Sequence, residues 1–177
     1  MPNIIILAGP NGAGKTSFGD NYLSGDENFE FVNADEMARG EDAKGMQARS
    51  DVFAARMMLS RLNELVQAKA NFMVETTLAT LAYAQKIPVW RMNGYVVTLV
   101  YLRLSTVEDS VERVRRRVAA GGHGIPEDAI RRRFIKSLQY LETIYKPIVD
   151  EWYIWESREG AFVFLESRSE DSHGPRT

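Results

Sequence analysis

The sequence predicts an α/β fold in which a mostly parallel sheet of about five strands lies between two layers of helices. Two observations support this prediction. Short apolar runs, which are typical of strands buried on both faces, alternate with longer segments of helical periodicity. The first apolar run also leads through a glycine-rich loop directly into a helical segment. Such alternation produces a parallel sheet with helices on both faces, a three-layer sandwich.

Three strands and two helices are expected in the first half of the chain. The strands are the apolar runs at 3–8, 29–33 and 71–75. A helix is expected to begin at Lys15 and to continue to Tyr22. From Met46 to Ala70, apolar residues recur at the spacing of a long amphipathic helix.

The next segments continue the alternation. A helix over 80–91 is expected to be interrupted near Pro88, because proline lacks the N–H that an interior helical position donates. The run 95–104 predicts the strongest strand of the chain. Either Ser105 or Thr106 can cap the helix that follows, whose first turn is acidic.

Glycines and prolines mark the boundaries in the C-terminal part. The segment 121–126 breaks the preceding helix, and a new helix is expected over 127–145, ending before Pro147. The apolar and aromatic stretches 152–155 and 161–166 are expected to supply one more strand or an edge hairpin.

Length and composition indicate one domain over 1–166, followed by a polar tail over 167–177 that is expected to be disordered. The chain has no cysteine, no signal-peptide pattern and no apolar run near the roughly 20 residues of a membrane span. We therefore expect a cytoplasmic protein without a membrane partner. The net charge of −2 predicts no general attraction to nucleic acid.

The loop after the first strand matches the pattern G-x-x-x-x-G-K-[ST] with the residues Gly9, Pro10, Asn11, Gly12, Ala13, Gly14, Lys15 and Thr16. Its glycines let backbone N–H groups converge on phosphates, and the following helix N-terminus, which includes Ser17, adds partial positive charge. Lys15 is expected to reach the β- and γ-phosphates, and the Thr16 hydroxyl to bind Mg²⁺. The alternative is a plain glycine turn. The sequence therefore predicts a P-loop NTPase fold of the kinase type that uses ATP and Mg²⁺.

Two carboxylates follow predicted strands. Asp35 comes after the second strand and Glu75 closes the third. Because ligands bind beyond the carboxyl ends of parallel strands, both can face the loop. Asp35 is a candidate base or metal ligand, or else an ordinary turn residue. Glu75 could serve the metal, substrate hydroxyls or the next helix, and the hydroxyls of Thr76 and Thr77 either join that site or cap the helix.

Arginines flank the 121–126 break and make the inner side of the expected helical hairpin basic: Arg113, Arg115, Arg116, Arg117, Arg131, Arg132 and Arg133. Such a hairpin could close over ATP as a lid, place guanidinium groups on the γ-phosphate and exclude water. For any single arginine the alternative is a solvated helix face. His123 is either a ligand contact or a hydrogen-bonding turn residue.

The ordered motifs G-P-N-G-A-G-K-T, V-N-A-D, E-T-T-L and R-V-x-x-R-V-x-x-G-G-H-x-I-P resemble those of the zeta toxin family, more narrowly its short bacterial members. The resemblance covers about 3–148. Zeta toxins are small kinases that use ATP and Mg²⁺ to phosphorylate a sugar hydroxyl of UDP-N-acetylglucosamine, and an antitoxin normally covers the ATP site. The resemblance therefore implies a sugar-nucleotide acceptor and an antitoxin partner.

The resemblance also implies roles for individual residues. Lys15 and Thr16 would contact the phosphates and the metal, and Asp35 matches the aspartate that activates the acceptor hydroxyl. Glu75 and Thr77 match the positions that hold the sugar nucleotide. The matches to the catalytic lid arginines are Arg117, Arg133 and, in reserve, Arg113.

The chain also departs from the family pattern. It is short beside the founding toxins, and Glu75-Thr76-Thr77 has a threonine where larger toxins tend to have glycine. The acceptor could therefore be another UDP-sugar or a different compound. Two further hypotheses stay open: a kinase of another metabolite or of a nucleic-acid 5′-hydroxyl, and a nucleotide-gated module that docks a partner protein with little turnover. The near-neutral charge argues against a polynucleotide.

Overall fold

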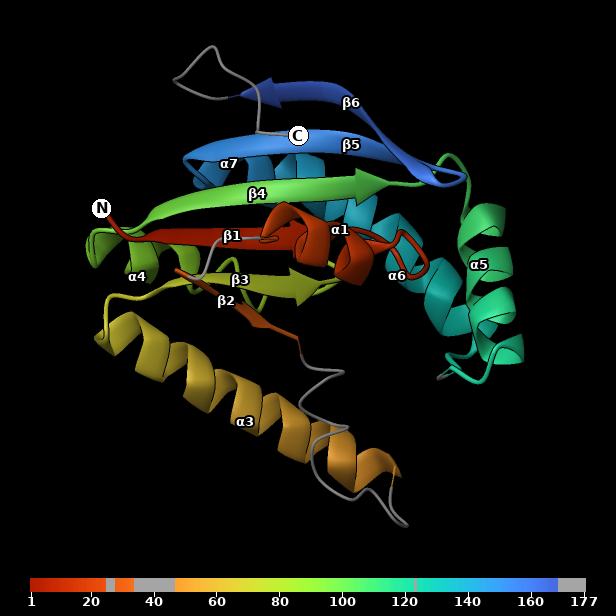
Figure 1. Ribbon diagram of the computed structural model, residues 1–177, viewed down its shortest axis with the longest axis horizontal. Helices are drawn as coiled ribbons and strands as arrows, with labels where there is room; N and C mark the ends of the chain where they lie inside the picture. The colour runs from red at the N-terminus through yellow and green to blue at the C-terminus, as the bar shows by residue number, and fades with distance from the viewer. Residues whose placement is uncertain (25–27, 34–46, 123, 169–177) are drawn as a thin grey trace.

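The computed structural model describes residues 1–24, 28–33, 47–122 and 124–168. In this part of the chain, one six-stranded sheet has the strand order β2-β3-β1-β4-β5-β6 (Figure 1). The strands are β1 (Asn3–Ala8), β2 (Phe29–Val32), β3 (Asn71–Thr76), β4 (Val96–Arg103), β5 (Glu151–Arg158) and β6 (Ala161–Arg168). The predicted α/β class is confirmed, with one strand more than the expected five.

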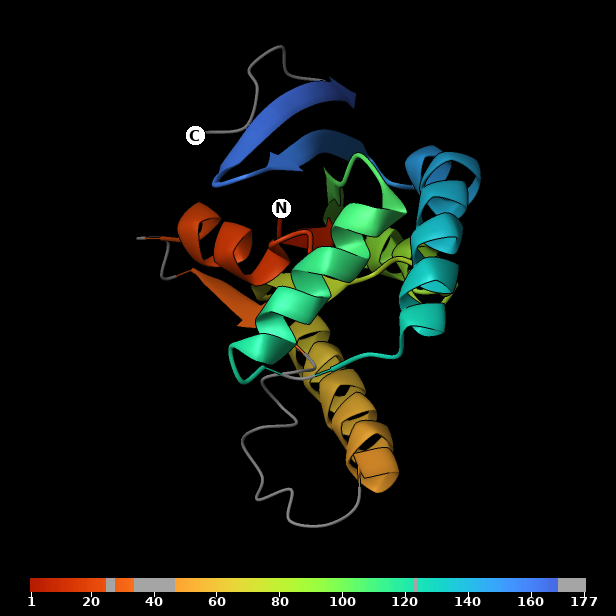
Figure 2. The same cartoon turned by 90° about the vertical axis from the view of Figure 1, so that its right-hand side faces the viewer.

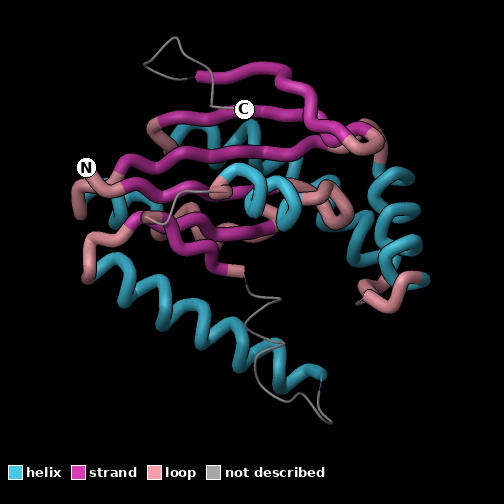
Figure 3. Tube along the Cα trace, viewed as in Figure 1, coloured by secondary structure: helices cyan, strands magenta, loops and turns pink. Residues whose placement is uncertain are grey.

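The first five strands are parallel, and only the β5–β6 hairpin is antiparallel. Figure 3 shows the strands in magenta, with the helices in cyan around them. β1 lies between β3 and β4, with Leu7 opposite Glu75 on one side and Val100 on the other. The strands β2 and β3 thus lie on one side of β1, and the later strands lie on its other side. The carboxyl ends of β1, β2 and β3 meet at one edge of the sheet. Ligands bind at such a switch point in open α/β sheets.

Both faces of the sheet are covered by helices (Figure 2). Along β1, Ile4 and Ile6 belong to the larger core, which is shared with α3 (Gln47–Gln67), α4 (Ile87–Met92) and the π-helical turn η1 (Leu141–Tyr145). Ile5 and Leu7 point to the other face, where they pack with α1 (Lys15–Tyr22). The continuous apolar run in β1 is explained by this burial on both sides.

The helical segment predicted over 80–91 was too long. In the structure, α-helix is confined to α4, and Pro88 lies in its first turn. Proline is favoured there because the first N–H groups of a helix have no intrahelical partner, so Pro88 starts this helix instead of interrupting it.

Two helices, α5 (Val107–Ala119) and α6 (Glu127–Tyr140), form the predicted hairpin. Thr106 caps α5, with its hydroxyl accepting from the Asp109 N–H at 3.1 Å. The segment after α6 stays helical through η1 and α7 (Lys146–Ile148), so the expected end before Pro147 was wrong. Pro147 lies in the first turn of α7, directly after η1, whose i→i+5 hydrogen-bond spacing interrupts the α-helical pattern at this point.

The C-terminal stretches form the edge hairpin that was one of two expectations. β6 continues to Arg168, two residues beyond the boundary expected at 166. The Arg168 guanidinium donates to the carbonyls of Lys146 and Val149 at 3.1 and 2.9 Å, which ties the end of β6 to α7. The rest of the tail, 169–177, lies outside the described residues.

Candidate active site

The glycine-rich loop between β1 and α1 has a backbone that only glycine adopts without strain. Gly12 and Gly14 have φ values of 80° and 81°. At Gly9, φ is 147°, and a Cβ atom would lie 2.4 Å from the carbonyl oxygen of Leu102 in β4. The first glycine of the motif is therefore required both by its conformation and by its close approach to the neighbouring strand.

The Lys15 side chain is buried in this loop. Its Nζ donates hydrogen bonds to the carbonyl oxygens of Gly9 and Pro10, both at 3.1 Å, and lies 3.7 Å from the Glu75 carboxylate. α1 begins at Lys15, so the N–H groups of its first turn lack intrahelical acceptors and point out of its N-terminus. An ammonium group and the N–H groups of a helix N-terminus are thus concentrated at one point, as phosphate binding requires.

Glu75 connects the loop with the end of the second strand. Its Oε2 accepts from the Thr16 hydroxyl at 2.9 Å and from Asn33 Nδ2 at 3.0 Å. Asn33 directly follows β2, and Glu75 lies at the end of β3. The sheet therefore brings together side chains that are far apart in sequence, as the strand-end argument predicted for Glu75.

The oxygen atoms of Thr16 and Glu75 fit a Mg²⁺ ion. Mg²⁺ prefers hard oxygen ligands and usually takes only one or two from the protein, with phosphates and water completing its shell. Among the described residues, no three His, Cys, Asp or Glu side chains form a metal-binding group. A hydroxyl with an adjacent carboxylate is nevertheless the donor set that a nucleotide-bound Mg²⁺ needs.

Helix α5 packs directly on the loop. The hydroxyl of Ser110, which is fully buried, donates to the carbonyl oxygen of Asn11 at 2.5 Å. One turn further, the Arg113 Cβ lies 2.9 Å from where a Cβ of Gly12 would stand. The second glycine is therefore needed for contact with α5 as well as for its φ.

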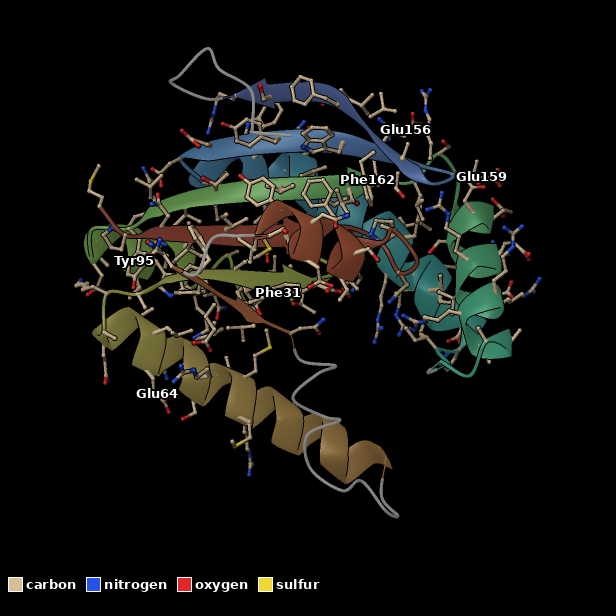
Figure 4. The ribbon with its side chains drawn as sticks, in the orientation of Figure 1. Phe31, Glu64, Tyr95, Glu156, Glu159 and Phe162 are labelled. Carbon is tan, nitrogen blue, oxygen red and sulfur yellow. The ribbon has the colours of Figure 1, made fainter. Side chains whose placement is uncertain are left out.

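The β5–β6 hairpin contacts the same loop from another side. Arg113 donates from Nη1 to the Ser157 hydroxyl at 2.7 Å and from Nη2 to the Ser157 carbonyl at 2.9 Å. Phe162 lies next to α1 in Figure 4, where its ring packs on Phe18 at 5.0 Å between centroids and lies beside Gly14. A cavity of about 500 Å³ opens between α5 and the hairpin turn at Glu159.

The family of the chain follows from its sequence. A family model described as an AAA domain (AAA_33) matches residues 4–143. The chain belongs to this AAA domain family. ATP binding is typical of the family, and the strand order and loop geometry agree with a P-loop kinase-like protein.

Relatives of this AAA domain are found at low identity. An uncharacterized protein of Haemophilus influenzae is 26% identical over 130 residues, which are 73% of this chain and 91% of that protein. Among solved structures, a chain from the PezAT chromosomal toxin–antitoxin system of Streptococcus pneumoniae superposes with a TM-score of 0.69 at 20% identity, covering 98% of this chain and 74% of that one.

Two other structures show how widely the fold is used. A chain of the Pnkp1/Rnl/Hen1 RNA repair complex has a TM-score of 0.67 at 21% identity, covering 81% of this chain and 46% of that chain. A chain of the AvrRxo1-ORF1:AvrRxo1-ORF2 complex with ATP has a TM-score of 0.70 at 16% identity, covering 96% and 59%. At these identities the likeness shows a shared fold, and the substrate has to be inferred from the site.

Most arginines of the α5–α6 hairpin are paired on its surface. Arg115 and Arg131 both bind Glu127, at 2.8 Å each, and Arg131 also binds Glu108 at 3.0 Å. Hydrogen bonds from Arg131 are the main reason that the pKa values of Glu108 and Glu127 lie below the usual range. The remaining surface pairs are Arg116 with Glu112 and Arg132 with Asp128. These four arginines therefore lie on the solvated surface of the hairpin, which was the alternative to a role in phosphate binding.

The three proposed lid arginines differ from one another. Arg113 is held by Ser157, as described above. Arg133 is half-buried on α6 and makes no hydrogen bond or ion pair with the residues that the structure describes. Arg117 lies near the end of α5 and is exposed. A phosphate-binding role stays a prediction for Arg117 and Arg133.

Other predicted residues are placed only in part. Asp35 and His123 lie outside the described residues. The Thr76 hydroxyl accepts from the Leu78 N–H at 3.1 Å, which supports the local turn role. Thr77 is half-buried next to it, and Ser17 is exposed in the first turn of α1.

Three residues of the site were missed in the sequence. Asn33 follows a predicted strand and could have been found by the argument that found Glu75. Ser110 and Ser157 had no such signal, because a serine in a helix or strand is usually a surface residue. Among the described helices, none is long and apolar enough to span a membrane.

Proposed function

We propose that the protein is an ATP- and Mg²⁺-dependent kinase that phosphorylates a hydroxyl group of a small molecule, with UDP-sugars such as UDP-N-acetylglucosamine as the first acceptors to test. The observation that carries the proposal is the cluster around Glu75. Its carboxylate contacts Thr16 and Lys15 of the loop and Asn33 at the end of β2. The phosphate-binding loop and the segment leading to Asp35 are thereby joined at one edge of the sheet.

The residues would divide the chemistry as follows. Lys15 and the N–H groups of the loop bind the β- and γ-phosphates and stabilise the charge that shifts during transfer. The Thr16 hydroxyl would bind the Mg²⁺ ion, and the Glu75 carboxylate, which accepts from that hydroxyl, would keep it oriented. When bound, the ion would neutralise phosphate charge. Asp35 accepts the proton of the acceptor hydroxyl. The acceptor oxygen then forms its bond to the γ-phosphorus as the bond to the bridging oxygen breaks, and ADP leaves.

The choice of acceptor rests on the resemblance to zeta toxins. The superposed chain from a toxin–antitoxin system supports it at the level of the fold. We propose in addition that the protein acts as the toxin of such a pair, with an antitoxin protein as its partner. Expression in a host cell would then arrest growth, and Lys15→Ala would abolish the arrest because it removes phosphoryl transfer.

The decisive experiment is an acceptor screen with purified protein, labelled ATP and Mg²⁺. We expect transfer of label to a UDP-sugar by the wild type, and loss of transfer in Lys15→Ala and Asp35→Asn. Lys136→Ala, which removes an exposed lysine of α6, is the matched control and should be unchanged. If the wild type labels no hydroxyl compound while it still binds ATP, the kinase proposal is wrong.

The same screen separates the alternatives. Oligonucleotides with a free 5′-hydroxyl and sugar acids belong in the panel, since labelling of either would move the assignment to that acceptor. ATP binding without turnover, combined with capture of a partner that needs ATP but not Asp35, would favour the nucleotide-gated module.

A further inference from the structure

The phosphate-binding loop is supported by contacts that lie outside the loop motif and the strand ends. We call the residues that make these contacts the brace: Ser110, Arg113, Ser157 and Phe162. α5 contacts the loop through Ser110 and Arg113, and the β5–β6 hairpin contacts it through Phe162. The two elements are in turn joined by the double hydrogen bond from Arg113 to Ser157. The loop therefore contacts two elements, α5 and the β5–β6 hairpin, which are also bonded to each other.

Arg113 provides the hydrogen bonds between these two elements. Its guanidinium forms two short bonds to one residue, a forked geometry that lysine cannot reproduce. Ser157 is only 5% exposed, whereas Arg113 is half-buried beside the cavity between α5 and the hairpin turn, so the two bonds are partly shielded from water. Arg113 Nη1 also lies 3.5 Å from the carbonyl oxygen of Gly12. The side chain of Arg113 thus connects α5, to which it belongs, with both the hairpin and the tip of the loop.

The tip of the loop is also the part with the most unusual backbone. Gly12 and Gly14 both have positive φ, a conformation that glycine adopts without strain but does not hold by itself, because its backbone is free to take many others. Phosphate binding needs the loop N–H groups to converge before the ligand arrives, because ordering them on binding would reduce affinity. Contacts that fix Gly12 and Gly14 therefore favour binding.

We propose that Arg113 is a positioning residue, which acts through Ser157 to fix the phosphate-binding loop in its nucleotide-binding shape. The inference rests on the proposed function of the loop and names the residue pair that regulates its affinity. It differs from the lid role suggested by the motif, in which Arg113 would contact the γ-phosphate itself.

The two roles are separated by a double-mutant cycle on the affinity for ATP with Mg²⁺, measured by calorimetry with the full chain. We expect Arg113→Gln to weaken binding about tenfold and Ser157→Ala about threefold. In the Arg113→Gln background, Ser157→Ala should have no further effect, because the hydroxyl no longer has its partner. Arg113→Lys should lie between wild type and Arg113→Gln.

Two controls keep the test specific. Arg116→Gln removes the same charge from an exposed position of the same helix, and its affinity should match the wild type. Urea unfolding of each variant measures stability separately. Equal loss of stability in the brace variants with unchanged ATP affinity would show a purely structural role and overturn the inference.

Other outcomes also decide the matter. Additive effects in the cycle, or a silent Ser157→Ala beside a strong Arg113→Gln, would mean that Arg113 contacts the nucleotide directly, and would overturn the positioning role. If the wild type and Lys15→Ala both fail to bind ATP, the proposed function itself fails. If the wild type binds and Arg113→Gln binds equally well, only the brace is refuted.

Discussion

The Thr16 hydroxyl and the Glu75 carboxylate lie 2.9 Å apart, although 59 residues separate them in sequence. The pairing exists because β3 is the neighbour of β1, so that the last residues of β3 lie beside the loop that follows β1. The carboxylate also lies 3.7 Å from Lys15 Nζ and compensates its charge. A carboxylate in this position can orient the hydroxyl that binds Mg²⁺.

We predict that Glu75→Gln lowers phosphoryl transfer about 10- to 100-fold and raises the Mg²⁺ concentration needed for half-maximal rate. Groups that orient a metal ligand typically have effects of this size. The measurement is initial rate against Mg²⁺ at saturating ATP. Glu64→Gln, an exposed glutamate of α3, serves as the control. An unchanged Mg²⁺ requirement in Glu75→Gln would place the metal elsewhere.

Gly9→Ala should destabilise the protein by about 2–5 kcal/mol. The new Cβ would lie 2.4 Å from the Leu102 carbonyl oxygen, and φ is 147°, so steric and backbone costs add. Gly94→Ala is the matched control, because its φ is 83° but no atom lies within 4 Å of the added Cβ. It should cost only about 1–2 kcal/mol. Urea unfolding measures both, and equal losses would contradict the steric argument.

The α/β class, the loop and the Glu75 position could be predicted because each rests on a local pattern. A buried strand, a glycine motif and a polar residue at a strand end can all be recognised within a few residues of the chain. The order of the strands in a parallel sheet then places the glycine loop and the polar strand-end residue close together, without further information from the sequence. Asn33 was accessible to the same reasoning, since it stands at the end of β2.

The remaining features depend on contacts between distant segments. Nothing near Ser157 indicates that Arg113, 44 residues earlier, binds it, because that contact follows from how α5 meets the hairpin. Pro88 and Pro147 were read as helix breakers, whereas both stand in first turns. Whether a proline interrupts or starts a helix depends on the preceding residues, and helical periodicity alone does not decide it.

Alkaline pH should destabilise the fold through buried tyrosines. Burial raises the pKa of Tyr101 to about 12, although its hydrogen bond with Ser137 at 2.8 Å acts in the opposite direction. The unfolded chain loses the phenol proton near pH 10 while the folded protein keeps it. The contribution of Tyr101 is therefore complete below pH 10 and is lost as the pH rises toward 12, at up to about 1.4 kcal/mol per pH unit.

Tyr101→Phe tests this prediction. At pH 8 it should cost about 1–2 kcal/mol, because the buried Ser137 hydroxyl loses its partner. Above pH 10 its unfolding free energy should fall less steeply than that of the wild type. Some slope should remain, since burial also raises the pKa values of Tyr83 and Tyr145. Parallel curves between pH 10 and 11.5 would contradict the assignment to Tyr101.

Arg133 offers the sharpest test of the lid. The N-terminal end of α6 lies beyond the carboxyl edge of the sheet (Figure 1). Arg133 belongs to this helix and is half-buried without a partner among the described residues. A guanidinium that contacts the γ-phosphate mainly in the transition state affects turnover more than binding. Arg133→Ala should therefore reduce kcat about 100-fold and change the ATP affinity less than threefold.

Arg132→Ala is the matched control for this prediction. Arg132 is the preceding residue, but it is exposed and lies 3.8 Å from Asp128 on the helix surface. Its loss should leave kcat and stability unchanged, because exposed ion pairs contribute little. If Arg132→Ala and Arg133→Ala have the same small effect, the α6 arginines form a solvated face. The transition state would then have to be stabilised by the P-loop, Mg²⁺ and the end of α5 alone.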